Sequence, residues 1–171
     1  MTTALKYFAA SFCAAGLLLS ACSGAKVASQ SHFARGGERA PSWSLPSLPG
    51  PSVSLASLHG KAVYLNFFAT WCHGCNEEVP DINATQQKYR ARGLQVVGVD
   101  VAENARKAAE FRNEHHLVYP IVIDDGTLRR EYDVNGLPVQ VFIDRSGTVR
   151  RVSVGQLSLA GMRNDVESIL Q

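Results

Sequence analysis

The sequence predicts an α/β fold with a mixed central sheet, and three observations support this class. Strand-like apolar segments alternate with segments of helical periodicity from residue 61 to residue 132. The early strand segments are almost continuously apolar, which indicates that helices cover both faces of the sheet. Two later apolar segments flank a short turn at 145–147, which predicts a hairpin, and one last helix follows.

Residues 1–21 are predicted to be a lipoprotein signal peptide. Lys6 precedes an apolar run over residues 7–19, which is roughly half the length of a membrane-spanning helix. The run ends in Leu-Ser-Ala-Cys, which resembles the lipobox of bacterial lipoproteins, and its Cys22 would receive the lipid. Acyl chains on Cys22 would anchor the protein to a membrane. Cleavage after a small-residue triplet such as 23–25, which would leave a soluble protein, stays open as an alternative.

Residues 22–40 are predicted to form a flexible tether, and residues 41–171 a single domain. The tether segment is rich in Ala, Ser and Gly and has few large apolar residues. If Cys13 leaves with the signal peptide and Cys22 carries lipid, two of the four cysteines remain. In an exported protein a lone cysteine pair indicates work on the disulfides of other proteins. The net charge of +2 is spread along the chain and indicates no nucleic-acid partner.

The domain is expected to contain strands and helices in alternation. In chain order these are a hairpin of 43–46 and 53–55, a strand at 61–68, a helix at 77–91, a strand at 94–100, a helix at 103–115, a strand at 119–124, a short helix at 128–132, a hairpin of 139–144 and 148–152, and a final helix with Leu159, Met162, Val166 and Ile169 on one face. Pro80 is expected to kink the first helix, because proline removes a backbone donor. In the second helix Ala105, Ala108, Ala109 and Phe111 are expected to face inward.

Cys72 and Cys75 are the candidate catalytic residues, because they lie where an apolar strand meets a helix. The first thiol is near a helix N-terminus, which favours its thiolate, and the second is one turn further on. Such a pair can carry two electrons by thiol–disulfide exchange. Half of a zinc site is disfavoured because no second ligand pair follows at usable spacing. An inert structural disulfide is disfavoured because so small a loop would stabilise little.

The segment 64–80, from the strand through the two cysteines to the proline, resembles the TlpA-like branch of the thioredoxin superfamily. Members of this branch include ResA-type thiol reductants of cytochrome c maturation. The resemblance implies a thioredoxin fold with an N-terminal hairpin and an inserted strand–helix, which 94–115 would supply. Gly-Leu-Pro at 136–138 matches the loop that carries the family's cis-proline.

The resemblance also implies roles for single residues. Cys72 would be the nucleophile and Cys75 the resolving thiol. Pro138 would lie in cis against the disulfide, where its missing N–H leaves neighbouring backbone free to pair with a peptide. Glu78 matches a buried acid beneath the active site and could exchange a proton with Cys75. Asn66 occupies the position of a buried Asp in thioredoxin and, as a neutral amide, cannot take up a proton.

The surroundings of the thiols depart from the family in part. Trp71 is expected to pack beside the thiols and shield them. Between the cysteines stand His73 and Gly74, where relatives often have Pro before the second Cys. A charged His73 could stabilise the thiolate of Cys72 and raise the reduction potential, whereas Gly74 relaxes the loop.

These observations favour an extracytoplasmic, membrane-anchored thiol–disulfide oxidoreductase, on the periplasmic side in a two-membrane cell. It would reduce disulfides of exported proteins, with apocytochrome c as the expected substrate, and take electrons from a membrane thiol donor. No cofactor is expected beyond the Cys72–Cys75 disulfide, and no metal.

Three alternatives stay open. One is a thiol oxidant or isomerase on the same scaffold. Another is a copper carrier that uses the two thiols with His73 or the pair His115 and His116, because thiolates suit Cu(I). A thiol peroxidase is the weakest, because Ala69 stands where such sites have Thr.

Overall fold

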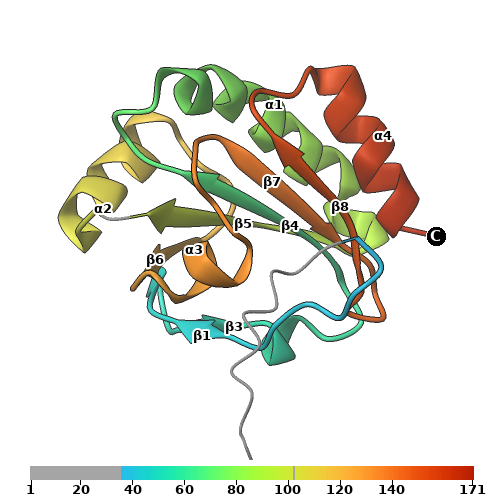
Figure 1. Ribbon diagram of the computed structural model, residues 1–171. Coiled ribbons are helices and arrows are strands. Elements are labelled where there is room, and N and C mark those ends of the chain that lie inside the picture. The colour runs from blue at the N-terminus through green and yellow to red at the C-terminus, as the bar shows by residue number, and fades with distance from the viewer. Residues whose placement is uncertain (1–35, 102) are drawn as a thin grey trace, which may run out of the picture. The chain divides into compact units, whose positions relative to one another are not determined.

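The computed structural model describes residues 36–101 and 103–171 (Figure 1). The predicted signal peptide, Cys13, Cys22 and most of the predicted tether lie outside these residues. The elements are β1 Ser44–Leu45, β2 Ser47–Leu48, β3 Val53–Ser54, the 3-10 turn η1 Ala56–Leu58, β4 Ala62–Phe68, α1 His73–Tyr89, η2 Arg90–Arg92, β5 Leu94–Val101, α2 Ala105–Glu114, β6 Ile121–Asp124, α3 Thr127–Glu131, β7 Val139–Ile143, β8 Val149–Val154 and α4 Leu159–Ile169.

A six-stranded sheet in the order β2-β6-β5-β4-β7-β8 forms the centre of the domain. Strand β4 runs parallel to β5 and antiparallel to β7, so the predicted mixed sheet is confirmed. All seven residues of β4 are buried, as its continuous apolar pattern indicates. The connection from β4 into α1 therefore starts from a fully buried strand of the sheet.

Helices cover both faces of this sheet (Figure 1). On one face lie α1, α2 and α4; Phe68 of β4 contacts Phe111 of α2 there, with ring centroids 5.1 Å apart. On the other face lie α3 and the N-terminal hairpin, where Phe67 contacts Tyr132 at 5.7 Å. Because neighbouring residues of a strand point to opposite faces, Phe67 and Phe68 anchor the two layers separately.

The N-terminal part of the domain departs from the prediction in two ways. The expected hairpin forms, since β1 pairs antiparallel with β3, but β2 between them joins the edge of the main sheet beside β6. Ordered contacts also begin before residue 41. The N–H groups of Gly37 and Ala40 donate to the carbonyls of Val149 and Gly147, at 2.7 and 2.9 Å. The end of the predicted tether is therefore attached to the β7–β8 hairpin.

Two helices begin at residues other than those predicted. Helix α1 starts at His73 rather than at 77, because the Cys72 side chain caps it, and the helix continues through Pro80. Helix α2 starts at Ala105, where Asn104 is the N-cap and accepts a hydrogen bond from the N–H of Lys107. The inward position predicted for Ala105 is wrong, because this first residue of the helix is exposed, whereas Ala108 and Phe111 are buried as predicted.

Within the described residues, every helix is too short or too polar to cross a lipid bilayer.

Candidate active site

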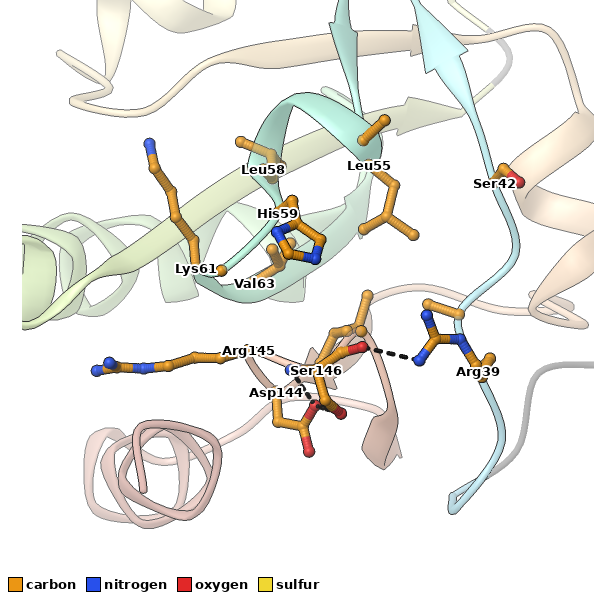
Figure 2. Close-up of a pocket in the computed structure, with 15 residues that line it drawn as sticks. Arg39, Ser42, Leu55, Leu58, His59, Lys61, Val63, Asp144, Arg145 and Ser146 are labelled. Atoms are coloured by element: carbon orange, nitrogen blue, oxygen red, sulfur yellow. Dashed lines mark hydrogen bonds between the residues drawn. The ribbon is translucent and has the colours of Figure 1, made fainter.

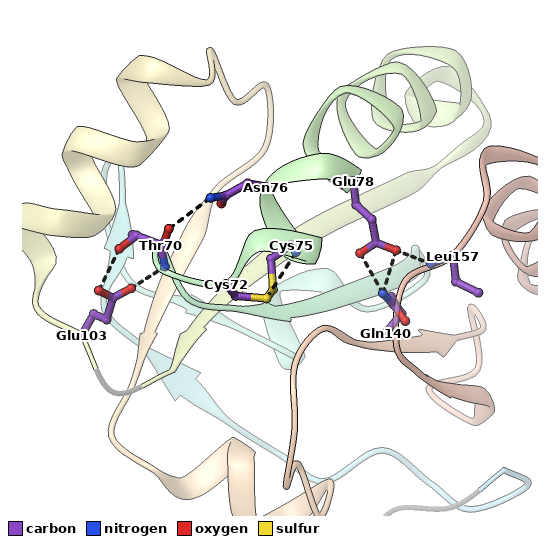
Figure 3. Close-up of a disulfide and its surroundings, with 8 residues drawn as sticks. All are labelled: Thr70, Cys72, Cys75, Asn76, Glu78, Glu103, Gln140 and Leu157. Carbon is purple, nitrogen blue, oxygen red and sulfur yellow. Dashed lines mark hydrogen bonds between the residues drawn. A yellow bond between two sulfur atoms is a disulfide. The ribbon is translucent and has the colours of Figure 1, made fainter.

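Cys72 and Cys75 form a disulfide at the N-terminus of α1, with the two sulfur atoms 2.06 Å apart (Figure 3). Cys72 is the N-cap residue, and its Sγ accepts a hydrogen bond from the N–H of Cys75 at 3.2 Å. Cys72 is 8% exposed and Cys75 only 1%. Cys72 is thus the more accessible of the two cysteines, and its predicted role as the nucleophile stays a prediction.

The turn between β4 and α1 is held by hydrogen bonds on several sides. The N–H of Cys72 donates to the carbonyl of Ala69 at 3.0 Å. The Asn76 side chain donates to the carbonyl of Thr70 at 3.2 Å, and the Glu103 carboxylate accepts from the N–H and the hydroxyl of Thr70 (Figure 3). Glu103 is not among the residues predicted for the site, because its partner lies 33 positions earlier in the chain.

Glu78 is buried, as the family resemblance implies, with 1% of its surface exposed. The side-chain NH2 group of Gln140 donates to both carboxylate oxygens, at 3.2 and 3.0 Å, and the N–H of Leu157 donates to one of them. Burial raises the pKa of Glu78, although the hydrogen bonds from Leu157 and Gln140 act in the opposite direction. Glu78 lies three residues after Cys75 on α1, and residues at this spacing are neighbours on one helix face.

Asn66 and Gln140 occupy paired positions of β4 and β7 and are both buried. Asn66, a neutral amide, thus lies directly beside Gln140, the residue that donates to Glu78. Gln140 is not among the residues predicted for the site. Its role as the partner of Glu78 depends on a contact across 62 positions of the chain.

His73 and Trp71 both lie at the surface. The side chain of His73 is 88% exposed, and its Nε2 is 3.2 Å from a carboxylate oxygen of Glu77 on the next turn of α1. Trp71 is 70% exposed and lines the same pocket as Cys72, and shielding of the thiols by its indole stays a prediction. Its backbone lies in the turn between β4 and α1, outside the buried end of β4, and the turn directs the indole to the surface.

An open pocket of about 490 Å³ lies beside Cys72. The active-site turn and the start of α1 line one side of the pocket, and the end of β5, α3 and the loop before β7 line the other. In that loop the peptide between Leu137 and Pro138 is cis, as predicted from the family resemblance. Pro138 is close to the active-site helix, since a side-chain Cβ placed on Gly74 would lie 3.8 Å from its Cδ.

Asp100 is a further buried acid that the sequence reading did not single out. It is the residue of β5 that pairs with Phe68, near the end of β4 that leads into the cysteine turn. Burial and, to a smaller extent, the charge of Glu103 raise its pKa, and Lys107 lowers it, with a net pKa of about 7. Within the described residues neither oxygen of its carboxyl group has a hydrogen-bond partner.

A second pocket, of about 270 Å³, lies at the other end of β4, between η1 and the turn that joins β7 to β8 (Figure 2). Arg39 donates to the carbonyl of Ser146 at its edge, at 3.0 Å. Burial favours a higher pKa for Asp144 in this turn, but hydrogen bonds from Ser146, Thr148 and Arg150 lower it to about 2. Asp144 therefore organises the turn as a carboxylate.

The histidine pair proposed for copper lies at the end of α2. The ring of His115 packs on Phe111, with centroids 4.3 Å apart, and the Asn83 side chain donates to the carbonyls of His115 and His116. Across residues 36–101 and 103–171, no three His, Cys, Asp or Glu side chains come together in a group that could hold a metal ion.

Comparisons with known proteins place the chain among thiol–disulfide proteins. The model of the AhpC/TSA family matches residues 36–152. The chain is 34% identical over 121 residues to the thiol-disulfide oxidoreductase ResA of Bacillus cereus, which covers 70% of each chain. It is 34% identical over 134 residues to the thioredoxin-like protein YneN of Bacillus subtilis, covering 77% of this chain and 78% of that one. The fold is also similar to a crystal structure from Chlorobium tepidum that is provisionally assigned as the thiol:disulfide interchange protein DsbE. The two superpose with a TM-score of 0.76 at 31% identity, over 81% of this chain and 99% of that chain.

Proposed function

The chain belongs to the AhpC/TSA family and is a thiol–disulfide oxidoreductase of the thioredoxin fold, and we propose that it reduces disulfides of exported proteins. Its substrate would be the pair of haem-binding thiols of apocytochrome c in disulfide form. Lipid on Cys22 would hold the protein on the extracytoplasmic face of a membrane, and a membrane thiol donor would return its own disulfide to the dithiol.

The observation that carries this proposal is the asymmetry of the disulfide, in which Cys72 is the more exposed cysteine and lines the open pocket. In the dithiol form, the thiolate of Cys72 attacks one sulfur of the substrate disulfide and releases the other as a thiolate. The thiolate of Cys75 then attacks the Cys72 sulfur of the mixed disulfide, which releases the second substrate thiol and closes Cys72–Cys75. Two electrons pass to the substrate, and the protein disulfide is the oxidised product.

Glu78 would handle the proton of the resolving step. Its carboxyl group is buried, its pKa is raised, and it lies one helical turn from Cys75. A carboxyl group in this state can accept the proton of the Cys75 thiol as that sulfur attacks, and return it when the dithiol is regenerated.

Two features of the site support the reducing direction. An ionised Glu78 near the thiols opposes formation of a second negative charge on sulfur, which destabilises the dithiolate and favours electron donation. His73, whose charge would act in the opposite sense, is exposed and pairs with Glu77. Solvent screens the charge of such an exposed pair.

The reduction potential of the Cys72–Cys75 couple tests this proposal. A potential at or below about −230 mV supports a reductant, whereas a potential above about −180 mV contradicts it and favours an oxidant or isomerase. In an exporting cell, Cys75→Ser is expected to accumulate mixed disulfides through Cys72. Apocytochrome c should be among the trapped proteins, and a Cys72→Ser, Cys75→Ser double variant is the control. Trapped partners that exclude apocytochrome c would overturn the substrate assignment.

A further inference from the structure

Glu103 makes hydrogen bonds directly to the active-site turn, although it belongs to the inserted strand–helix segment. Its two carboxylate oxygens accept from the N–H of Thr70 at 2.6 Å and from the Thr70 hydroxyl at 2.8 Å (Figure 3). The carboxylate also lies 3.4 Å from the ammonium group of Lys107, and the Glu103 side chain is only 2% exposed. Hydrogen bonds to a charged acceptor are stronger than those between neutral groups, and burial limits competition from water.

Thr70 is fixed on its other side as well. Its carbonyl accepts a hydrogen bond from the Asn76 side chain, so the N–H, the hydroxyl and the carbonyl of Thr70 all take part in hydrogen bonds. Thr70 is two residues before Cys72, and two residues of extended chain span at most about 7 Å. The contact with Glu103 therefore acts on the backbone immediately before the nucleophile and involves neither sulfur.

We propose that Glu103 is a positioning residue for thiol exchange, which holds the turn at Thr70 so that the sulfur of Cys72 stays at the N-terminus of α1. The stabilisation of an anion by a helix N-terminus falls off within the first turn, so a small displacement of the sulfur weakens it. The proposal rests on the function proposed above and assigns a task to the inserted β5–α2 segment. Glu103 directly precedes Asn104, the N-cap of α2, which fixes its place relative to that helix.

The test measures the reactivity of Cys72 in the full chain with Cys13, Cys22 and Cys75 replaced by Ser, so that one thiol remains. The rate of alkylation by iodoacetamide is followed against pH, and the midpoint reports the thiol pKa. Glu103→Gln and Glu103→Ala are compared in this background. Both remove the same charge, but only Gln keeps an oxygen that can accept from the N–H of Thr70. The difference between them therefore isolates the hydrogen bond from the charge.

We expect the Ala variant to react at least fivefold more slowly at pH 7 than the Gln variant, with its midpoint at higher pH. Thr70→Val, which removes only the hydroxyl, should slow the reaction about twofold to threefold, and Thr70→Ser should restore it. Glu110→Gln is the matched control, since Glu110 is an exposed residue of α2 that pairs with Arg106. Its rate should stay within a factor of about 1.5 of the parent's, because solvent screens the charge of an exposed residue.

Equal rates and midpoints in Glu103→Gln and Glu103→Ala would overturn the proposal. The proposal would also be overturned if the alkylation rate fell only in proportion to the loss of stability in urea, with the pH midpoint of the thiol unchanged. If Glu103→Ala does not fold, the comparison of Thr70→Val with Thr70→Ser decides in the same way. Iodoacetamide requires no protein substrate, so the alkylation test and the reduction potential are independent. Either the positioning role of Glu103 or the reducing function can be contradicted while the other is supported.

Discussion

Two buried acids near the disulfide differ in what surrounds them. Glu78, on α1, receives hydrogen bonds from Gln140 and from the N–H of Leu157. Asp100, at the end of β5, is equally buried, but within the described residues its carboxyl oxygens receive none. Burial raises the pKa of both groups, and only Glu78 has donors that counteract it. The comparison teaches that hydrogen-bond donors decide whether a buried carboxyl group can carry charge near the thiols.

The largest effect is expected from Asp100→Asn. With a pKa of about 7 in the folded protein and 3.8 as the reference value, Asp100 ionises first in the unfolded chain as the pH rises. Stability is therefore lost progressively from about pH 4 to about pH 7, and the loss persists above that range. The pKa difference between the folded and unfolded states corresponds to a loss of at most about 4 kcal/mol in the free energy of unfolding.

Urea unfolding of the oxidised protein at pH 4 and pH 8 measures this effect. We compare the free energy of unfolding of Asp100→Asn with that of the unsubstituted protein at each pH. The difference should favour the variant more at pH 8 than at pH 4. Glu110→Gln, which removes an exposed carboxylate, serves as the control for a change of charge alone. An identical stability difference at the two pH values would show that Asp100 does not ionise differently in the folded protein.

A smaller effect is expected from Gln140→Leu, which would make Glu78 more like Asp100. The substitution removes the donor to both carboxylate oxygens and leaves the N–H of Leu157. The pKa of Glu78 should rise further, and the free energy of unfolding at pH 8 should fall by about 1–3 kcal/mol, because a buried charged group loses a partner.

Unfolding in urea at pH 5 and pH 8 measures the result, and the loss should be greater at pH 8, where the carboxylate form is favoured. Gln87→Leu, at an exposed position of the same helix, is the matched control. Equal losses at the two pH values would mean that Gln140 contributes through packing rather than through the charge of Glu78.

The smallest effect is expected from His73→Ala. This residue lies between the cysteines, but its side chain is 88% exposed and pairs with Glu77. Its removal should change the redox equilibrium constant less than about threefold, or about 15 mV for two electrons. Equilibration with thiol buffers of set ratio measures this, with Glu77→Gln as the companion variant. A change of more than about 60 mV would place the charge of His73 at the thiolate.

Much of the fold could be predicted from local patterns. The continuous apolar run of β4 and the turn at 145–147 led to the mixed sheet. The edge strand β2 was missed because its pairing joins Ser47 to Val122, which are far apart in the chain, and such a pairing leaves no local signal. The 70% exposure of Trp71 could not be predicted, because it depends on the turn that carries this residue out of the buried strand.

The sequence by itself determined the chemistry of the site: two thiols at a strand-to-helix junction, and a carboxyl group one turn further along the same helix. These relations hold within a few residues, so helix geometry fixes them wherever the helix packs. The tertiary structure alone decided the surroundings of the acids, since the donors to Glu78 and the partner of Glu103 are 62, 79 and 33 positions away. Hydrogen bonds over such separations exist only after the sheet has brought distant segments together, and no local pattern encodes them.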